Sequence, residues 1–432
     1  MRRVVTAALL VLISVGSAYA AAAKGYSVTL TIEGVRSSKG HVLTTLCGDP
    51  AQFMRGCAGP ASRQTAMQGT MKIIFDNVAA GTYAISVLHD ENDNGRYDYP
   101  DEGYAIGNDA PYPPTFESAS IKVSGDTATH VKMVYFTAAQ VAPTDIKPIV
   151  VRDNGLNAEL YVPEHKGKLP AVLVMGGSEG GIGVGRLMGL PLTKEGYAVM
   201  ALAYFRAEGL PQTLDRIPLE YFKTALDWLK ARPEIDASRI AIYGASKGAE
   251  AVLVIASHYD GIRAVVAAAP TDVVWQSLNF VGTEPHSSWS LGGKDVPYVP
   301  FDTSKPYSPG EPYVEIYRRS IKADPNHDDA IIKVENIKGA VLLLSGTDDQ
   351  EWDSTEMADR VIARLDAHHF AYPHQHLRYE GAGHLCCINP GAVAAGVLPP
   401  TLKVGGTPEI DAKARADAWH EIVAFLDSNL KH

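Results

Sequence analysis

One stretch, residues 239–250, constrains the fold of this chain more than any other. It reads Arg-Ile-Ala-Ile-Tyr-Gly-Ala-Ser-Lys-Gly-Ala-Glu, so an apolar run meets G-x-S-x-G and a helical pattern follows at once. A strand, a sharp turn and a helix in this order hold the turn serine in a strained backbone at the top of a sheet. We therefore predict that Ser246 is a nucleophile at a helix N-terminus, where free N–H groups favour developing negative charge. The competing interpretation is an ordinary glycine-rich turn with a capping serine.

From about residue 150 the chain alternates apolar strands with helices. The expected strands are 170–177, 198–204, 240–243, 263–269, 338–345 and 376–379. The expected helices are 187–195, 218–231, 249–257, 354–366 and 412–430. Nearly continuous apolar strands separated by helices indicate an α/β domain, 151–432, with a mostly parallel sheet covered on both faces.

The N-terminal part has a different pattern. Residues 26–136 alternate apolar and polar side chains in short runs between Gly, Pro, Asn and Asp, which predicts a small β-sandwich domain. Residues 137–150 lack such a pattern and form the expected linker. In the second domain, segment 272–335 is rich in aromatic residues and prolines. We expect either a lid that binds part of a substrate or an excursion that packs on itself.

Residues 1–20 have the features of an export signal. Two arginines precede an apolar run over residues 4–15, and small residues occupy positions 18 and 20. The run is too short to span a membrane comfortably, so we expect cleavage after Ala20 and export of a soluble protein to the periplasm. The formal net charge of −10, without a Lys/Arg cluster, argues against nucleic acid as a partner.

The four cysteines form two pairs in the sequence. Cys47 and Cys57 lie close together in a chain that we expect to be exported, so we predict a disulfide between them. Cys386 and Cys387 are adjacent, and we expect them to be packing residues that do not bond to each other. Neither pair has the spacing of metal ligands.

A polar loop in the N-terminal domain, residues 89–102, resembles a calcium-binding loop. Its oxygen-bearing side chains and its turn glycine are Asp90, Asn92, Asn94, Gly95, Asp98 and Asp101. The alternative is a polar turn whose side chains cap their own backbone. We therefore keep calcium as one hypothesis for this loop.

A serine nucleophile needs a base and an orienting acid, which follow it in the order Ser, acid, His in this type of sheet. His384 ends a glycine-rich turn, Gly-Ala-Gly-His, after a late strand, and we predict it as the base. Asp348 and Asp349 follow the strand 338–345, and we prefer Asp349 as the acid. Asp353 is expected to cap the helix that opens at residue 354. Such chemistry requires neither a metal nor an organic cofactor.

The oxyanion of a tetrahedral intermediate requires backbone donors. We predict the N–H of Lys247 together with donors from Gly177 and Ser178, in the glycine-rich loop 176–181 that follows the apolar strand residues 172–175. The alternative interpretation of this loop is a phosphate-binding site, but the loop lacks the G-x-x-x-x-G-K-[ST] pattern of such sites.

Residues 150–430 resemble the α/β-hydrolase domain of acyl-CoA thioesterases and bile acid-CoA:amino acid N-acyltransferase, and more distantly dienelactone hydrolases. The stretches that carry the resemblance are VMGGSEGG, IAIYGASKGAE, LLLSGTDDQEWDS and LRYEGAGH. The resemblance implies an α/β-hydrolase fold and a triad of Ser246, Asp349 and His384. Residues 81–85, 89–98 and 107–108 resemble an uncharacterised family of small secreted β-domains, which implies a binding or structural module.

The sequence thus predicts a serine hydrolase that cleaves a small-molecule acyl ester or thioester through an acyl-enzyme. One alternative is an acyltransferase to an acceptor other than water. Another is an exported carboxylesterase or dienelactone-hydrolase-like enzyme without preference for CoA, because the periplasm holds little CoA. A non-catalytic binding protein is the third alternative. The sequence makes no prediction of the oligomeric state.

Overall fold

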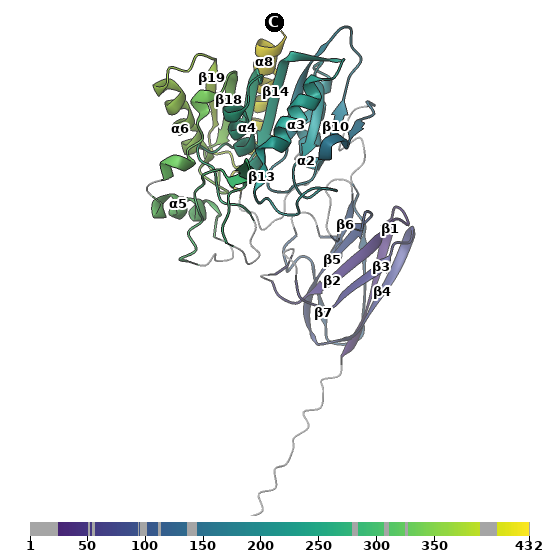
Figure 1. The fold of residues 1–432 in the computed structure, drawn as a ribbon. Coiled ribbons are helices and arrows are strands. Elements are labelled where there is room, and N and C mark those ends of the chain that lie inside the picture. Colours follow the sequence, from purple (N-terminus) through teal and green to yellow (C-terminus); the bar gives the residue numbers. More distant parts are fainter. Residues whose placement is uncertain are drawn as a thin grey trace, which may run out of the picture.

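The computed structural model describes residues 25–50, 52–53, 57–93, 95, 102–110, 114–135, 145–278, 284–305, 311–324, 327–388 and 404–431. The predicted export signal and most of the predicted linker lie outside these residues. Figure 1 shows two bodies, a β-rich N-terminal part and a larger part with helices on both sides of a sheet. Among the described helices, none combines the length and the apolar character that a membrane span requires.

The larger part is built on an eight-stranded sheet. Its strands, in the order in which they pair, are β19 (His374–Tyr379), β18 (Ala340–Gly346), β15 (Ala264–Ala268), β14 (Ile235–Ala245), β11 (Leu169–Met175), β12 (Ala198–Ala203), β10 (Asn157–Tyr161) and β9 (Ile149–Val151). The strands from β19 to β12 are mutually parallel, and β10 is antiparallel to both of its neighbours. The carboxyl ends of the parallel strands therefore meet at one edge, where ligand sites of such sheets lie.

Helices cover both faces of this sheet and enclose two separate cores (Figure 1). One face carries α3 (Leu219–Lys230), α4 (Lys247–His258) and α6 (Ser354–Ala367). The other face carries α2 (Gly183–Gly189) and α8 (Pro408–Leu430). Neighbouring strand residues such as Leu173 and Val174 point to opposite cores, so the central strands are apolar along their whole length. This is the α/β-hydrolase architecture that the alternating pattern predicts.

Helix α2 differs from the sequence-based expectation. Helix α2 begins at Gly183 and continues as the 3₁₀ helix Leu190–Thr193, whereas the sequence predicts a helix from residue 187. Glycine is a poor helix former, but a Cβ at Gly185 would lie 3.1 Å from the Val174 carbonyl oxygen. Close packing on β11 therefore outweighs helix propensity there.

The N-terminal part contains two sheets that enclose one core, the sandwich that its alternating pattern predicts. The first sheet comprises β4 (Gly69–Val78), β1 (Tyr26–Val35) and β8 (Thr127–Lys132). The second comprises β3 (Ala61–Thr65), β2 (His41–Cys47), β5 (Gly81–Asp90) and β6 (Gly103–Ile106), with β7 (Ser120–Val123) also paired to β5. A disulfide joins Cys47, at the end of β2, to Cys57.

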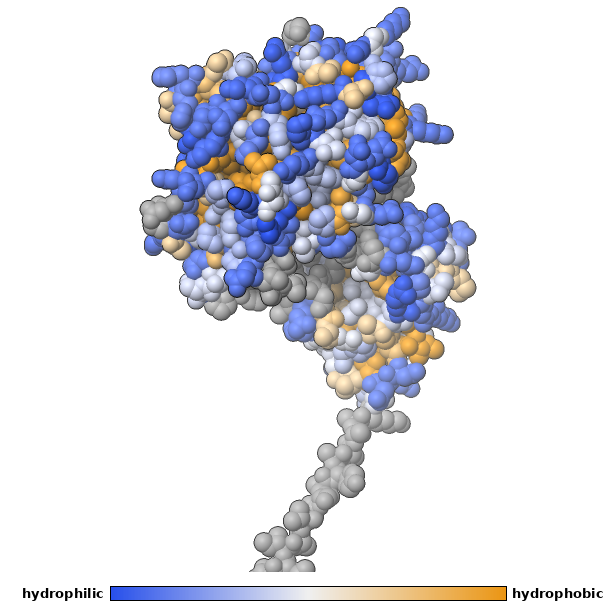
Figure 2. Space-filling model, viewed as in Figure 1, coloured by the Kyte–Doolittle hydropathy of each residue, from blue (hydrophilic) through white to orange (hydrophobic). Residues whose placement is uncertain are grey.

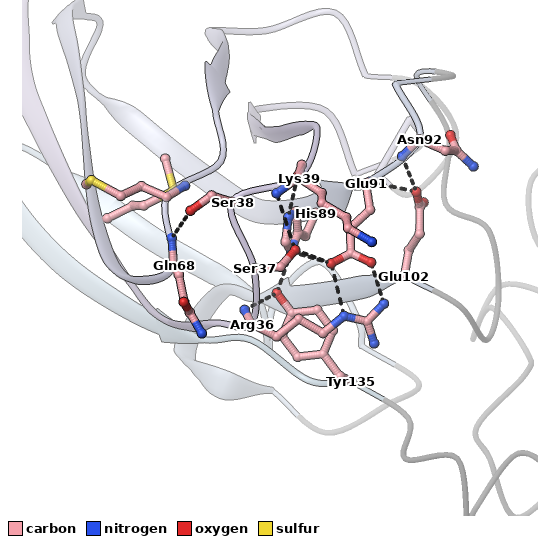
Figure 3. Close-up of polar contacts among 12 residues, drawn as sticks. Arg36, Ser37, Ser38, Lys39, Gln68, His89, Glu91, Asn92, Glu102 and Tyr135 are labelled. Carbon is pink, nitrogen blue, oxygen red and sulfur yellow. Dashed lines mark hydrogen bonds and ion pairs between the residues drawn. The ribbon is translucent and has the colours of Figure 1, made fainter.

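A polar cluster closes one end of the sandwich (Figure 3). His89 is fully buried, and its Nδ1 and Nε2 lie 2.7 Å from the Tyr135 hydroxyl and 2.9 Å from the Lys39 carbonyl oxygen. The Arg36 guanidinium pairs with Glu91, and its hydrogen bond to that carboxylate lowers the pKa of Glu91 to about 2. The buried His89 and the partly buried Glu91 therefore each have partners inside the cluster.

The described surface is mostly polar. Figure 2 shows hydrophilic residues over most of the face in view, with apolar residues in small groups. In the sandwich the large exposed apolar side chains include Met67, Ile74 and Val134. Scattered apolar residues of this kind are normal on protein surfaces.

Candidate active site

Ser246 lies in the turn between β14 and α4. Its backbone has φ 56° and ψ −123°, a strained conformation for a residue other than glycine, and its N–H donates to the Ala268 carbonyl oxygen at 2.9 Å. A Cβ at Gly244 would lie 2.1 Å from the Gly248 carbonyl oxygen, and one at Gly248 would lie 2.3 Å from the Gly176 carbonyl oxygen. The two glycines therefore allow β14, α4 and the end of β11 to meet at this turn.

Asp349 and His384 are brought together at the same edge of the sheet. Asp349 follows β18, and His384 follows β19, the strand that pairs with β18. His384 Nδ1 lies 2.8 Å from Asp349 Oδ2, and both side chains are buried. Asp349 also accepts bonds from the Ser354 hydroxyl and from the backbone N–H groups of Glu351 and Trp352. The carboxylate is thus fixed on all sides, and it fixes the imidazole.

The two neighbouring aspartates have other partners. Asp348 accepts hydrogen bonds from the Gly406 N–H and the Gln350 side chain, so it holds the loop in place. Asp353 is the N-cap residue of α6, but its side chain makes no capping hydrogen bond. It pairs with Arg318 instead, at 2.7 and 2.8 Å, so the capping role predicted for it is wrong.

His384 presents its second nitrogen to the site. Nε2 is buried, and no hydrogen bond joins it to Ser246 or to any other described residue. Burial alone would lower the pKa of His384, but the charge and hydrogen bond of Asp349 and the charge of Glu351 raise it above its ordinary value. An imidazole held in this way can accept a proton at Nε2, and the bond to a nucleophile tightens when substrate binds.

The predicted oxyanion donors differ in their present partners. Lys247 is the first residue of α4, so its backbone N–H has no acceptor within the helix. The Gly177 N–H donates to Glu179 Oε1 at 2.8 Å, so a substrate oxygen would have to displace that carboxylate. Ser178, in the same loop, is exposed. A Cβ at Gly177 would lie 3.1 Å from Ser246 Cβ, which places this backbone beside the serine.

Glu179 is a residue that the sequence did not single out. Its side chain is exposed to solvent, yet protein surrounds its carboxylate closely enough that desolvation raises its pKa to about 7. The hydroxyl of the buried Tyr204 donates to the Gly176 and Gly177 carbonyl oxygens, both at 3.0 Å. The two loop carbonyls are therefore bound by Tyr204, while the Gly177 N–H is bound by the Glu179 carboxylate.

A buried ion pair lies directly behind the serine turn. Lys247 Nζ lies 2.6 Å from Glu250 Oε2, and both side chains are almost completely buried. Glu250 Oε1 accepts hydrogen bonds from the Trp289 indole N–H at 2.7 Å and from the Trp275 backbone N–H at 3.2 Å. Burial lowers the pKa of Lys247 and raises that of Glu250. Glu250 thereby attaches segment 272–335 to the nucleophile helix.

Aromatic side chains of segment 272–335 form a continuous set of ring contacts that reaches His384 through Trp352. The Trp352 ring contacts His384 edge to face, with 5.7 Å between ring centroids, and contacts Tyr317 at 5.5 Å. Tyr317 in turn contacts Trp275, on which Phe301 stacks. These side chains belong to a small apolar cluster separate from the two sheet cores. Trp275, Phe301 and Tyr317 therefore pack on one another, and whether the segment also covers a substrate stays a prediction.

Two further predictions concern metals and cysteines. In the calcium-like loop, Asp90 is buried and accepts a hydrogen bond from the Gly95 N–H at 2.8 Å. Asn92 also lies within the described residues, whereas Asn94, Asp98 and Asp101 lie outside them, so the calcium hypothesis stays a prediction. Over the described ranges, no group of three or more His, Cys, Asp or Glu side chains is placed to hold a metal ion.

Cys386 and Cys387 are buried in the core under α8 and form a disulfide with each other. The prediction that the two cysteines are packing residues is consistent with their burial, but the prediction that they do not bond to each other is wrong. The two residues lie in the turn over residues 384–387, which brings their side chains to the same side.

Comparison with known proteins identifies two regions. Residues 217–432, half of the chain, match the family described as BAAT / acyl-CoA thioester hydrolase C terminal. Residues 30–132 match a family of uncharacterised proteins conserved in bacteria. Acyl-coenzyme A thioesterase 6 of Mus musculus is 32% identical over 294 residues, which cover 66% of this chain and 66% of that protein. The mitochondrial acyl-coenzyme A thioesterase 2 of Homo sapiens is 31% identical, with 67% of this chain and 58% of that protein covered.

The first of these relatives is thus matched over slightly less than two thirds of its own length. Among solved structures, a dienelactone hydrolase-like promiscuous phosphotriesterase from metagenomic libraries aligns over 66% of this chain and 97% of its own, with a TM-score of 0.42 and 17% identity. A puromycin-hydrolysing peptidase of Mycobacterium tuberculosis aligns over 80% of this chain and 52% of its own, with a TM-score of 0.48 and 13% identity. On the match over residues 217–432, the chain belongs to the BAAT / acyl-CoA thioester hydrolase C-terminal family.

Proposed function

We propose that this protein is a serine hydrolase that cleaves an ester or thioester of a small acyl substrate through an acyl-enzyme. The observation that carries the proposal is the buried Asp349–His384 pair, whose second nitrogen has no partner in the described chain, at the sheet edge where Ser246 lies in a strained turn. In this mechanism the Ser246 hydroxyl attacks the carbonyl carbon and its proton passes to His384 Nε2. Asp349 holds the imidazole and stabilises the imidazolium.

Backbone N–H groups stabilise the oxyanion of the tetrahedral intermediate. Lys247 supplies one donor, and Gly177 supplies the second once the substrate oxygen has replaced Glu179. His384 then protonates the leaving group, and water hydrolyses the acyl-Ser246 ester. The mature protein acts in the periplasm, after cleavage of residues 1–20, so its substrate need not be a CoA thioester.

The test is the initial rate of the mature protein on a matched panel. The panel contains p-nitrophenyl esters and acyl-CoA thioesters of equal chain lengths, with Ser246→Ala as the control. We expect Ser246→Ala to remove turnover of every substrate while thermal unfolding stays unchanged. A variant that retains most of its activity would contradict the assignment of Ser246. The better class of substrate then identifies the natural leaving group as CoA or as a simple alcohol.

A further inference from the structure

Glu351 is a second carboxylate next to the candidate triad, and the proposed mechanism does not use it. Its backbone N–H donates to Asp349 Oδ1 at 2.9 Å. The next residue, Trp352, donates to the same oxygen at 3.2 Å and contacts the His384 ring. The segment 349–352 therefore wraps around one carboxylate oxygen, and the position of Glu351 relative to the imidazole is fixed by the backbone.

Glu351 is a half-buried residue, and the state of its carboxylate is unusual. Its Oε2 atom is enclosed by protein and has no hydrogen-bond partner among the described residues. Desolvation raises the pKa of Glu351 to about 7, and the charges of His384 and Asp349 act on it in opposite directions. A buried oxygen without a partner costs folding free energy, so such groups concentrate at functional sites.

His384 Nε2 is another enclosed side-chain atom without a partner in the described chain. Glu351 and His384 interact electrostatically, because the charge of Glu351 raises the pKa of His384 and the charge of His384 lowers the pKa of Glu351. The charge of Glu351 also raises the pKa of Tyr317, which packs on Trp352. Glu351 Oε2 and His384 Nε2 can each accept a hydrogen bond. A water molecule carries two hydrogens on one oxygen, so it can donate one to each of these atoms.

We propose that Glu351 positions the water that attacks the acyl-enzyme, an inference that rests on the proposed function. One hydrogen of this water points to Glu351 Oε2 and the other to His384 Nε2. The water oxygen forms a bond to the acyl carbon as its proton passes to Nε2, which gives a tetrahedral intermediate. This intermediate collapses when the bond from carbon to Ser246 Oγ breaks and His384 returns the proton to Oγ. The products are a carboxylic acid and the free serine, so atoms and charges balance.

This role separates the two halves of the reaction. Acylation uses Ser246, His384 and Asp349 and needs no water, so it should depend only weakly on Glu351, through the effect of its charge on His384. Deacylation needs an oriented water, so it should depend on the carboxylate. Positioning and proton transfer of this kind typically contribute 10²- to 10⁴-fold to a rate, and an acceptor that only orients the water lies toward the lower end.

The experiment is rapid-mixing kinetics of the mature protein with p-nitrophenyl acetate, with intact-protein mass spectrometry to detect acetyl-Ser246. In Glu351→Leu we expect acylation within about 3-fold of wild type, deacylation slowed by roughly 10- to 100-fold, and accumulation of the acetyl-enzyme. Glu351→Gln keeps an oxygen acceptor without the charge and should lie between the two. Glu356→Leu, which removes an exposed carboxylate of α6, is the matched control and should behave as wild type.

The outcomes are distinguishable. Equal slowing of both steps in Glu351→Leu, or unchanged deacylation, overturns the role of Glu351 while the hydrolase assignment stands. With propylamine present, the variant should transfer a larger share of acetyl groups to the amine than wild type. A smaller share would show that Glu351 binds an amine acceptor, which also overturns the proposal. A wild-type protein that turns over the ester without acetyl-Ser246, together with an active Ser246→Ala, overturns the proposed function itself.

Discussion

The two domains each bury a histidine, and the two residues differ in one respect. His89, in the sandwich, is fully buried with a hydrogen-bond partner for each ring nitrogen. His384, in the α/β domain, is buried with Asp349 on one nitrogen and no described partner on the other. Burial alone therefore does not distinguish a structural histidine from a candidate catalytic one, whereas the partner of the second nitrogen does.

The polar groups around the two histidines differ in the same way as the histidines themselves, in whether they have hydrogen-bond partners. Around His89, the Tyr135 hydroxyl, the Lys39 carbonyl and the Arg36–Glu91 pair satisfy one another (Figure 3). Around His384, a second enclosed atom, Glu351 Oε2, also lacks a described partner. Satisfied buried polar groups stabilise a fold, whereas unsatisfied ones cost stability, which a bound reactant returns when it supplies the missing hydrogen bond.

The largest expected effect separates the two histidines directly. His384→Leu should lower kcat/KM by at least about 10⁴-fold, because the base of the proposed triad is lost. His89→Leu should leave kcat/KM unchanged and lower the free energy of unfolding of the sandwich by about 2 kcal/mol, because Tyr135 and Lys39 lose their partner. Steady-state kinetics and thermal unfolding of both variants make the comparison. Similar losses of activity in the two variants would contradict it.

The second test extends the comparison to buried charges that have partners. Glu250→Gln leaves the Lys247 ammonium buried without a countercharge and should lower the free energy of unfolding by about 3 to 5 kcal/mol. The exposed pair Lys223–Asp227 on α3 is the matched control, and Asp227→Asn should cost less than about 1 kcal/mol. Urea unfolding measures both values. A loss in Glu250→Gln no larger than in the control would show that the buried pair does not support the nucleophile helix.

The smallest expected effect concerns Glu179, whose carboxylate is held by the Gly177 N–H. Its pKa is raised to about 7, so the side chain is protonated below that pH and ionised above it. The ionised form competes with a substrate oxygen for Gly177 and places negative charge where an oxyanion would form. The ratio of kcat/KM for Glu179→Gln to that of wild type should therefore be near one at pH 5.5 and rise a few-fold by pH 8.5. A ratio that does not change with pH would show that Glu179 does not compete with substrate.

Sequence patterns anticipated the parts of this molecule that depend on contiguous residues. The turn at Ser246, the glycines around it and the strand ends before Asp349 and His384 are each encoded within a few positions. The strands that the sequence missed include exposed or very short ones and also the buried β10. Strand β3 is almost entirely exposed, β6 has only four residues, and β9 only three.

The contacts that modify the site were not predictable, because they join residues that are distant in the sequence or fold back locally. Glu250 reaches Trp289, and no local pattern selects a partner 39 positions away. Glu179 turns back onto the Gly177 N–H, which depends on the conformation of a glycine-rich loop. Glu351 stands beside a recognised motif, but its lack of a described partner is visible only when the surrounding elements have been assembled.

The attachment of segment 272–335 to Glu250 has a consequence for protein engineering. Two donors, the Trp289 indole and the Trp275 backbone, anchor the segment to the helix that carries the nucleophile. A grafted or shortened insertion between β15 and β18 would have to supply two donors at these points, or the carboxylate behind the serine would lose them. Loop exchanges that aim at a new substrate range must therefore keep both of these hydrogen bonds to Glu250.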